Sequence, residues 1–174
     1  MNVVHSFEPI VGPDATTLIL GSMPGVASLA AQQYYAHPRN AFWPIMGTLV
    51  GAGPELPYDA RTERLRSSGV AVWDVLKLCT RAGSLDSAIV ESSIVANDFE
   101  SLFDVHPTIA RVFFNGAKAA ESYRRYVATG WTLPGVEFTR LPSTSPAHAS
   151  LDLVAKTEAW ASAFSREPAS GNDE

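Results

Sequence analysis

Four short apolar segments, each bounded by turn residues, constrain the fold of this 174-residue chain more than any other feature. They span residues 16–21, 69–75, 111–116 and 136–141, and their pattern predicts β-strands. The second and third are apolar on both faces, which is typical of buried parallel strands. Helical patterns separate or follow them at residues 40–51, 58–68, 97–105, 117–128 and 150–164. This alternation predicts an α/β fold, a three-layer α/β/α sandwich with a central, mainly parallel four-stranded sheet.

Two of these helical patterns give further detail. The helix expected at 97–105 begins with Asn97 and Asp98, residue types that favour helix N-termini. The closing helix at 150–164 is expected to turn four apolar side chains inward: Leu151, Val154, Trp160 and Phe164. We assign residues 1–165 to one domain and expect residues 166–174 to form a disordered acidic tail.

Composition excludes several classes of protein. The net charge of −5 argues against a broad cationic DNA-coating surface, although it permits a local basic face. A single cysteine, Cys79, excludes an intramolecular disulfide framework and a four-cysteine iron–sulfur cluster. Four scattered histidines without metal-ligand spacing predict no metal site, and we expect no cofactor. The N-terminal residues lack the cationic and apolar regions of a signal peptide, so we expect a cytoplasmic protein.

A turn of small and rigid residues follows the first strand: Gly21-Ser22-Met23-Pro24-Gly25. Pro24 fixes φ, and Gly25 permits backbone angles that are closed to other residues. Such a turn commonly holds main-chain N–H groups where a ligand can reach them. A plain strand-to-helix connection would have the same composition.

An aromatic segment comes next, with the sequence YYAHPRNAFW at residues 34–43. Residues 15–38 contain no Asp, Glu, Lys or Arg, yet Pro24 and two glycines exclude a membrane helix. Aromatic faces stack on any nucleobase, and an amide can bond a base edge or a water molecule. A neutral segment of this kind therefore suits a pocket for a flat heterocycle.

Polar features gather where the predicted strands end. They are the turn at 21–25, Trp73-Asp74 in the second strand, Asn115-Gly116 after the third, and residues 142–148 after the fourth. In open parallel sheets, ligands bind beyond the carboxyl ends of the strands. The convergence of four features at this edge predicts the binding site more strongly than any one of them.

The turn and the aromatic segment together resemble motif 1 of the uracil-DNA glycosylase superfamily. The resemblance is closest to the mismatch-specific and hypoxanthine-DNA glycosylase branches. In the mismatch-specific enzymes the middle of the turn is an Asn that orients the attacking water, whereas this chain has Met23. The hypoxanthine branch lacks that Asn and uses the Asn of the His-Pro-x-Asn segment, which is Asn40 here.

Residues 141–146, LPSTSP, resemble motif 2 of the same superfamily, a loop that enters the DNA minor groove. The resemblance implies a DNA-binding loop whose prolines add stiffness, whose hydroxyls bond phosphate or base edges, and which carries a small wedge. Its expected members are Pro142, Ser143, Thr144, Ser145, Pro146 and His148. Alternatively, the segment is a Ser-capped entry to the last helix. Leu141 stands where several branches have His.

The resemblance also implies roles for single residues. Asn40 would orient water toward C1′ of an extruded nucleotide. The expected base-binding residues are Ser22, Met23, Pro24, Gly25, Tyr35, Asp74 and Asn115, with Tyr35 stacking on the base. The residues alone leave simpler readings open: Asn40 as a helix cap, Tyr35 and Asp74 as structural, Asn115 as a turn residue. We interpret His37 as fixing the turn before Pro38. We expect Arg81, Arg124 and Arg125 to be solvated cations, with phosphate contact as the alternative for any of them.

Taken together, these features predict a monofunctional DNA glycosylase that hydrolyses the N-glycosidic bond of deaminated bases, with hypoxanthine first. It would use base flipping and a water nucleophile, and bind DNA containing a deaminated base as a monomer away from membranes. Two alternatives stay open. The substrate could be uracil, xanthine or mismatched thymine, or the chain could be a catalytically weak DNA- or nucleotide-binding domain.

Overall fold

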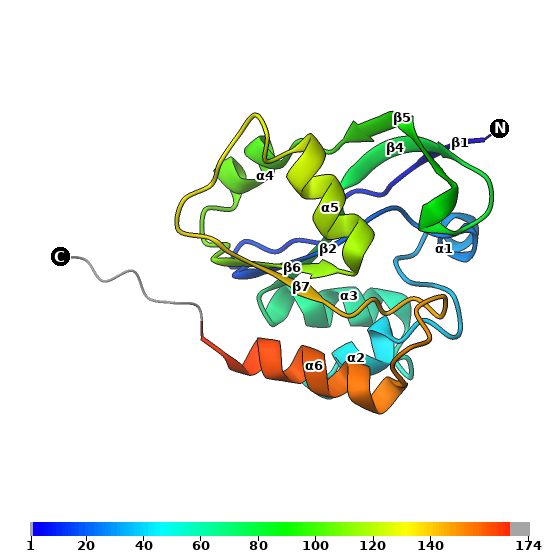
Figure 1. Ribbon diagram of the computed structural model, residues 1–174. Coiled ribbons are helices and arrows are strands. Elements are labelled where there is room, and N and C mark those ends of the chain that lie inside the picture. The colour runs from blue at the N-terminus through cyan, green and yellow to red at the C-terminus, as the bar shows by residue number, and fades with distance from the viewer. Residues whose placement is uncertain (1, 168–174) are drawn as a thin grey trace.

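A four-stranded parallel sheet forms the centre of the computed structural model, which describes residues 2–167 (Figure 1). Its strand order is β3-β2-β6-β7, with β2 at Thr17–Gly21, β3 at Val70–Asp74, β6 at Arg111–Asn115 and β7 at Glu137–Leu141. All three neighbouring pairs are parallel. The predicted sheet is therefore confirmed. Apart from residues 166 and 167, the predicted acidic tail lies outside the described residues.

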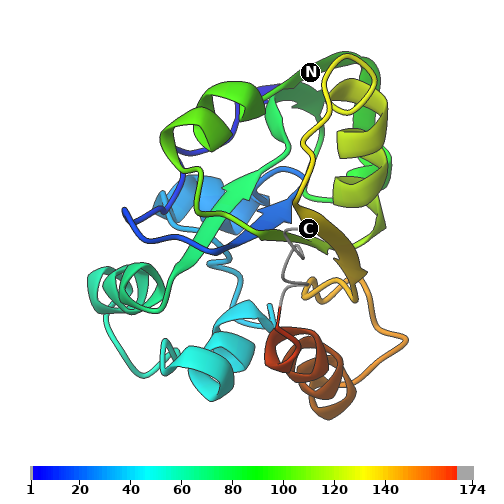
Figure 2. The same ribbon diagram turned by 90° about the vertical axis from the view of Figure 1, so that its left-hand side faces the viewer.

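Side chains of the central strands alternate between two apolar clusters. In β2, Leu18 and Leu20 face one cluster and Ile19 faces the other. Burial on both faces explains why β2 and the middle of β6 are almost wholly apolar, whereas the edge strand β7 is mostly exposed and carries charged residues. The first cluster is covered by α4 (Phe99–Val105) and α5 (Ala117–Tyr126), and the second by α2 (Phe42–Val50), α3 (Tyr58–Ser67) and α6 (Leu153–Ser165). The three layers are visible in Figures 1 and 2.

A second sheet extends the fold beyond the prediction. It is antiparallel with the order β1-β4-β5, formed by β1 (Val3–His5), β4 (Leu76–Arg81) and β5 (Ile89–Ala96). The buried Val75 alone separates the end of β3 from the start of β4. The chain therefore passes from one sheet into the other directly beside Asp74. Cys79 and Ile89 of the second sheet pack in the same apolar cluster as α4 and α5.

The helix boundaries differ from the prediction in informative ways. A short helix, α1 (Val26–Ala31), was not predicted. The closing helix starts at Leu153 because the Asp152 carboxylate caps it, accepting a hydrogen bond from Ala155 N at 2.8 Å. Leu151 and Val154 are consequently 38% and 65% exposed, so their predicted inward orientation is wrong. Among the described helices, none is long and apolar enough to cross a membrane.

Candidate active site

A cavity of about 500 Å³ lies beyond the carboxyl ends of the central strands. All the base-binding and catalytic residues predicted from the sequence line it: Ser22, Met23, Pro24, Gly25, Tyr35, Asn40, Asp74 and Asn115. The predicted DNA-binding loop contributes Ser143, Thr144, Ser145, Pro146 and His148. Pro142 is not among the lining residues, and its carbonyl accepts a hydrogen bond from Trp160 Nε1 at 2.9 Å. The structure thus brings the predicted residues together at the predicted edge of the sheet.

The turn at 21–25 directs its carbonyls into the protein. The Ser22 carbonyl accepts a hydrogen bond from the first main-chain N–H of β4 at 3.1 Å, and the Pro24 carbonyl accepts one from Arg81 Nη2 at 2.7 Å. In a trans peptide the next N–H points opposite to the carbonyl. The N–H groups of Met23 and Gly25 therefore point away from β4. The Met23 side chain is 7% exposed and packs in the first apolar cluster.

Two glycines of this turn permit close approach by other side chains. Gly21 pairs with Asp74 in the parallel register, and a Cβ atom on Gly21 would lie 2.6 Å from Asp74 Oδ1 and 2.9 Å from the Tyr35 hydroxyl. The Asp74 carboxyl therefore leans across Gly21. Gly25 has φ of −73°, an angle that other residues adopt freely, so the predicted conformational reason for Gly25 is wrong. A Cβ atom there would lie 3.4 Å from Ser84 Oγ.

Tyr35 has an unusual backbone and a partly buried side chain. Its φ of +53° is in the left-handed region, which bulky residues rarely adopt and which costs about 1–3 kcal/mol. Its ring stacks on Phe42, with centroids 4.1 Å apart. One ring face is therefore covered by protein. The Tyr35 hydroxyl is buried and has no hydrogen-bond partner among the described residues, and burial raises its pKa.

Asp74 is a buried acid at the junction of the two sheets. It is 3% exposed, and its Oδ2 atom has no hydrogen-bond partner within residues 2–167. Burial raises the pKa of Asp74 to about 7, the Asp86 carboxylate adds to this shift, and the Arg81 guanidinium opposes it. At neutral pH a substantial fraction of this carboxyl is therefore protonated and able to donate a hydrogen bond.

Asn40 lies just before α2 and lines the cavity. Its Oδ1 accepts a hydrogen bond from Phe42 N at 2.9 Å, so the side chain supports the start of α2, whose N-cap residue is Ala41. This capping bond leaves the amide nitrogen and a second lone pair for a water molecule or ligand in the cavity. His37 Nδ1 accepts a hydrogen bond from Arg39 N at 3.1 Å, so His37 fixes the turn as predicted.

Asn115 is joined to the loop at 142–148 by two hydrogen bonds. Its Nδ2 donates to Thr144 Oγ1 and its Oδ1 accepts from Thr144 N, both at 2.9 Å. Thr144 is 1% exposed, and its carbonyl accepts from Ala41 N at 2.9 Å. Thr144 therefore connects the end of β6 to the segment that carries Asn40. We call these two side chains the Asn115–Thr144 pair.

The sequence profile of the Uracil DNA glycosylase superfamily matches residues 9–165. The chain belongs to this superfamily. A protein named hypoxanthine DNA glycosylase from Methanosarcina barkeri is 34% identical over 163 residues, covering 93% of this chain and 98% of that protein. A protein of the same name from Methanosarcina acetivorans is 32% identical over 163 residues, with the same coverage.

A solved structure supports the same assignment. The solution NMR structure of a uracil DNA glycosylase candidate from Methanosarcina acetivorans superimposes with a TM-score of 0.76 and 32% identity. The match covers 94% of this chain and 97% of that one. The predicted superfamily and fold are both confirmed.

In this superfamily member, residues 142–148, which we call the motif 2 loop, are held by hydrogen bonds within the loop and to α6. Ser143 Oγ accepts from Ser145 N at 3.1 Å, and Ser145 Oγ accepts from Ala147 N at 3.2 Å. The buried Lys156 donates to the Ser145 carbonyl at 3.2 Å. The loop hydroxyls thus stiffen the loop, in addition to the prolines that the sequence suggested.

Arg81 is a structural residue of this glycosylase fold, so its predicted solvation is wrong. It is 1% exposed, and its Nε donates to the Gly83 carbonyl at 2.7 Å in addition to its bond with Pro24. Its guanidinium therefore braces the turn at 21–25 and is not available to a phosphate. Arg124 and Arg125 are exposed, as expected.

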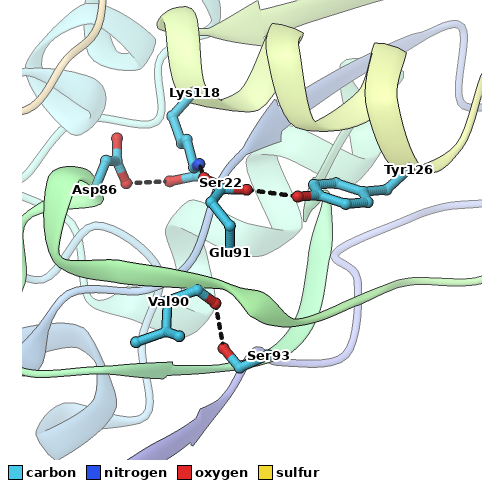
Figure 3. Close-up of polar contacts among 7 residues, drawn as sticks. All are labelled: Ser22, Asp86, Val90, Glu91, Ser93, Lys118 and Tyr126. Atoms are coloured by element: carbon cyan, nitrogen blue, oxygen red, sulfur yellow. Dashed lines mark hydrogen bonds and ion pairs between the residues drawn. The ribbon is translucent and has the colours of Figure 1, made fainter.

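Sequence reasoning missed one wall of the cavity. Ser84, Leu85, Asp86 and Ser87 of the loop at 82–88 line it, together with Lys118 of α5. The Ser22 hydroxyl donates to Asp86 Oδ1 at 2.6 Å (Figure 3). Figure 3 also shows Lys118 paired with Glu91. The second sheet, which the sequence did not reveal, places residues 84–87 at the cavity.

The chemistry of the cavity is that of amides, hydroxyls and carboxyls. Among the described residues, no group of three or more His, Cys, Asp or Glu side chains could hold a metal ion. Asn40 and Asp74 contribute an amide and a carboxyl to its lining.

Proposed function

We propose that this protein is a monofunctional DNA glycosylase that releases deaminated bases from DNA, with hypoxanthine as the preferred base, and that it acts as a monomer. The observation that carries the proposal is the pairing of a free amide, Asn40, with a buried acid, Asp74, in the cavity at the strand ends. The turn that meets them carries Met23 and no acid. The two similar Methanosarcina proteins named hypoxanthine DNA glycosylase support this choice of substrate.

The base would be read by its lactam edge. Hypoxanthine has a carbonyl where adenine has an amino group, so main-chain N–H donors at Met23 and Gly25 favour the deaminated base. A protonated Asp74 can donate to a carbonyl and accept from the adjacent ring N–H. The free face of Tyr35 would stack on the ring.

The reaction would proceed through a sugar cation. As the bond from C1′ to N9 breaks, its electron pair leaves with the base, and donors in the cavity stabilise the developing charge. Asn40 would hold the water that adds to C1′, and this water would lose its proton to solvent. An amide is a weak base, so the scheme requires a stable leaving group, which a carbonyl-bearing base supplies.

Duplexes that contain one deoxyinosine, deoxyxanthosine, deoxyuridine or deoxyadenosine test the proposal. The expected result is alkali-labile abasic sites at deoxyinosine and none at deoxyadenosine. Asn40→Ala should slow single-turnover release by roughly 10²–10³-fold while DNA binding is kept. Absence of base release from every duplex, or undiminished release by Asn40→Ala, would refute the assignment.

A further inference from the structure

Leu85 is a large apolar side chain exposed at the cavity mouth. It is 56% exposed and lines the cavity from the loop at 82–88. In Figure 1 this loop (green) and the motif 2 loop (orange) lie on the same side of the molecule, above and below the strand ends. An apolar residue in this position meets whatever covers the mouth.

The residues on both sides of Leu85 are fixed to the turn at 21–25 and to the start of α1. Ser84 Oγ accepts from Val26 N at 2.8 Å, and Asp86 Oδ1 accepts from the Ser22 hydroxyl at 2.6 Å. The Leu85 carbonyl accepts from a main-chain N–H three residues later at 3.0 Å. Leu85 is therefore presented by a braced loop rather than a free one.

The motif 2 loop lacks a comparable side chain. Its residues from 142 to 148 are PSTSPAH, and Thr144 is 1% exposed. The sequence suggested that this loop carries a small wedge, but the loop contains no large apolar side chain that could fill a gap in a base stack. Proteins that distort DNA commonly insert a leucine or a similar apolar side chain between bases.

We infer that Leu85 is the wedge: it enters the duplex beside the damaged base and occupies the space that the extruded nucleotide leaves. This inference rests on the proposed function and names the part of the protein that holds the flipped state. The partner surface is the stacked interior of duplex DNA. Because the anchors of Leu85 lie in the base-binding turn and at the start of α1, which follows it directly, filling the stack and seating the base become a single event.

Single-turnover release from deoxyinosine duplexes tests the wedge, comparing wild type, Leu85→Ala and Leu85→Met. Leu85→Ala should be slower by roughly 10- to 100-fold, because unstacking is then not compensated, and Leu85→Met should retain most of the rate. On single-stranded DNA the Ala variant should match wild type. A pyrene nucleotide opposite deoxyinosine should restore its rate on the duplex. Equal losses on both kinds of DNA, or no restoration by pyrene, would overturn the wedge.

Val105→Ala is the matched control. Val105 is 72% exposed, ends α4 and is not among the residues that line the cavity. This variant should behave as wild type in every assay. A loss equal to that of Leu85→Ala would show a general effect of removing surface apolar groups and would overturn the inference.

A binding measurement separates the two claims. In an Asn40→Ala background, 2-aminopurine beside deoxyinosine should brighten on binding, and adding Leu85→Ala should remove this increase. If the fluorescence increase depends on Leu85 but the wild-type protein releases no base, the proposed function is refuted and the wedge is supported. Base release with brightening that does not depend on Leu85 would refute the wedge alone.

Discussion

Asp74 titrates in a range where both folding and catalysis can be followed. Its pKa of about 7 in the folded protein lies above the ordinary value of 3.8. Between these values the folded chain holds a proton that the unfolded chain has lost, so the free energy of unfolding falls as pH rises from about 4 to 7. Asp74→Asn removes this component. Thermal melts should therefore show that the melting temperature of the wild type falls across this pH range relative to that of Asp74→Asn, and that the difference between the two proteins is constant outside it.

The same substitution predicts an activity profile. Asn supplies a donor and an acceptor at every pH, whereas Asp74 loses its donor as pH rises above about 7. Wild-type base release should therefore decline above neutrality while Asp74→Asn stays level. Parallel declines in both proteins, measured by single turnover, would exclude Asp74 as the donor.

Two substitutions of Asn40 distinguish its hydrogen bond to the start of α2 from its proposed role in catalysis. Asn40→Ser keeps a good helix-capping oxygen for Phe42 N but removes the amide, whereas Asn40→Ala removes both. We expect both variants to lose base release, and only the Ala variant to lose about 0.5–2 kcal/mol of stability. Activity close to wild type in Asn40→Ser would mean that the residue acts only as a cap.

Between elements, the Asn115–Thr144 pair is the main tie between β6 and the motif 2 loop. Thr144→Val keeps the shape and removes the hydroxyl, and Asn115→Ala removes both bonds. A double-mutant cycle on base release should show a coupling of about 0.5–3 kcal/mol, because the two side chains share their contacts. Thr157→Val, on the exposed side of α6, is the control and should add independently. Additive effects for Asn115 and Thr144 would show that the pair does not hold the loop for catalysis.

The central sheet could be predicted because every one of its strands carries its own apolar signal. The second sheet could not be predicted, because β1 has only three residues and the apolar residues of β4 are interrupted by charged ones such as Lys77. That omission hid Asp86 and Leu85, which depend on the β4–β5 connection. Arg81 was misjudged for the same reason, since its burial follows from long-range packing. The residues of motif 1 were placed correctly because strand order alone brings them to the cavity.

For the molecule as a whole, charge predicts how DNA is bound. The net charge is −5, and among the described residues that line the cavity Lys118 is the only Lys or Arg. Few phosphates can then be neutralised, so the logarithmic dependence of affinity on salt should have a slope of about −1 to −3. Fluorescence anisotropy of an Asn40→Ala protein on a deoxyinosine duplex from low to moderate salt measures it. A slope near about −6 would require a cationic surface elsewhere on the protein.

The register of β2 against β3 sets a rule for reading related chains. Gly21 and Asp74 are neighbours across two strands, and the carboxyl occupies the volume where a side chain on residue 21 would begin. Substitutions at the two positions are therefore not independent. A relative with any larger residue at the position of Gly21 should have a shorter one at that of Asp74, and with it a different preferred base. The residue types at these two positions can therefore be used to group unassayed superfamily sequences by expected substrate class.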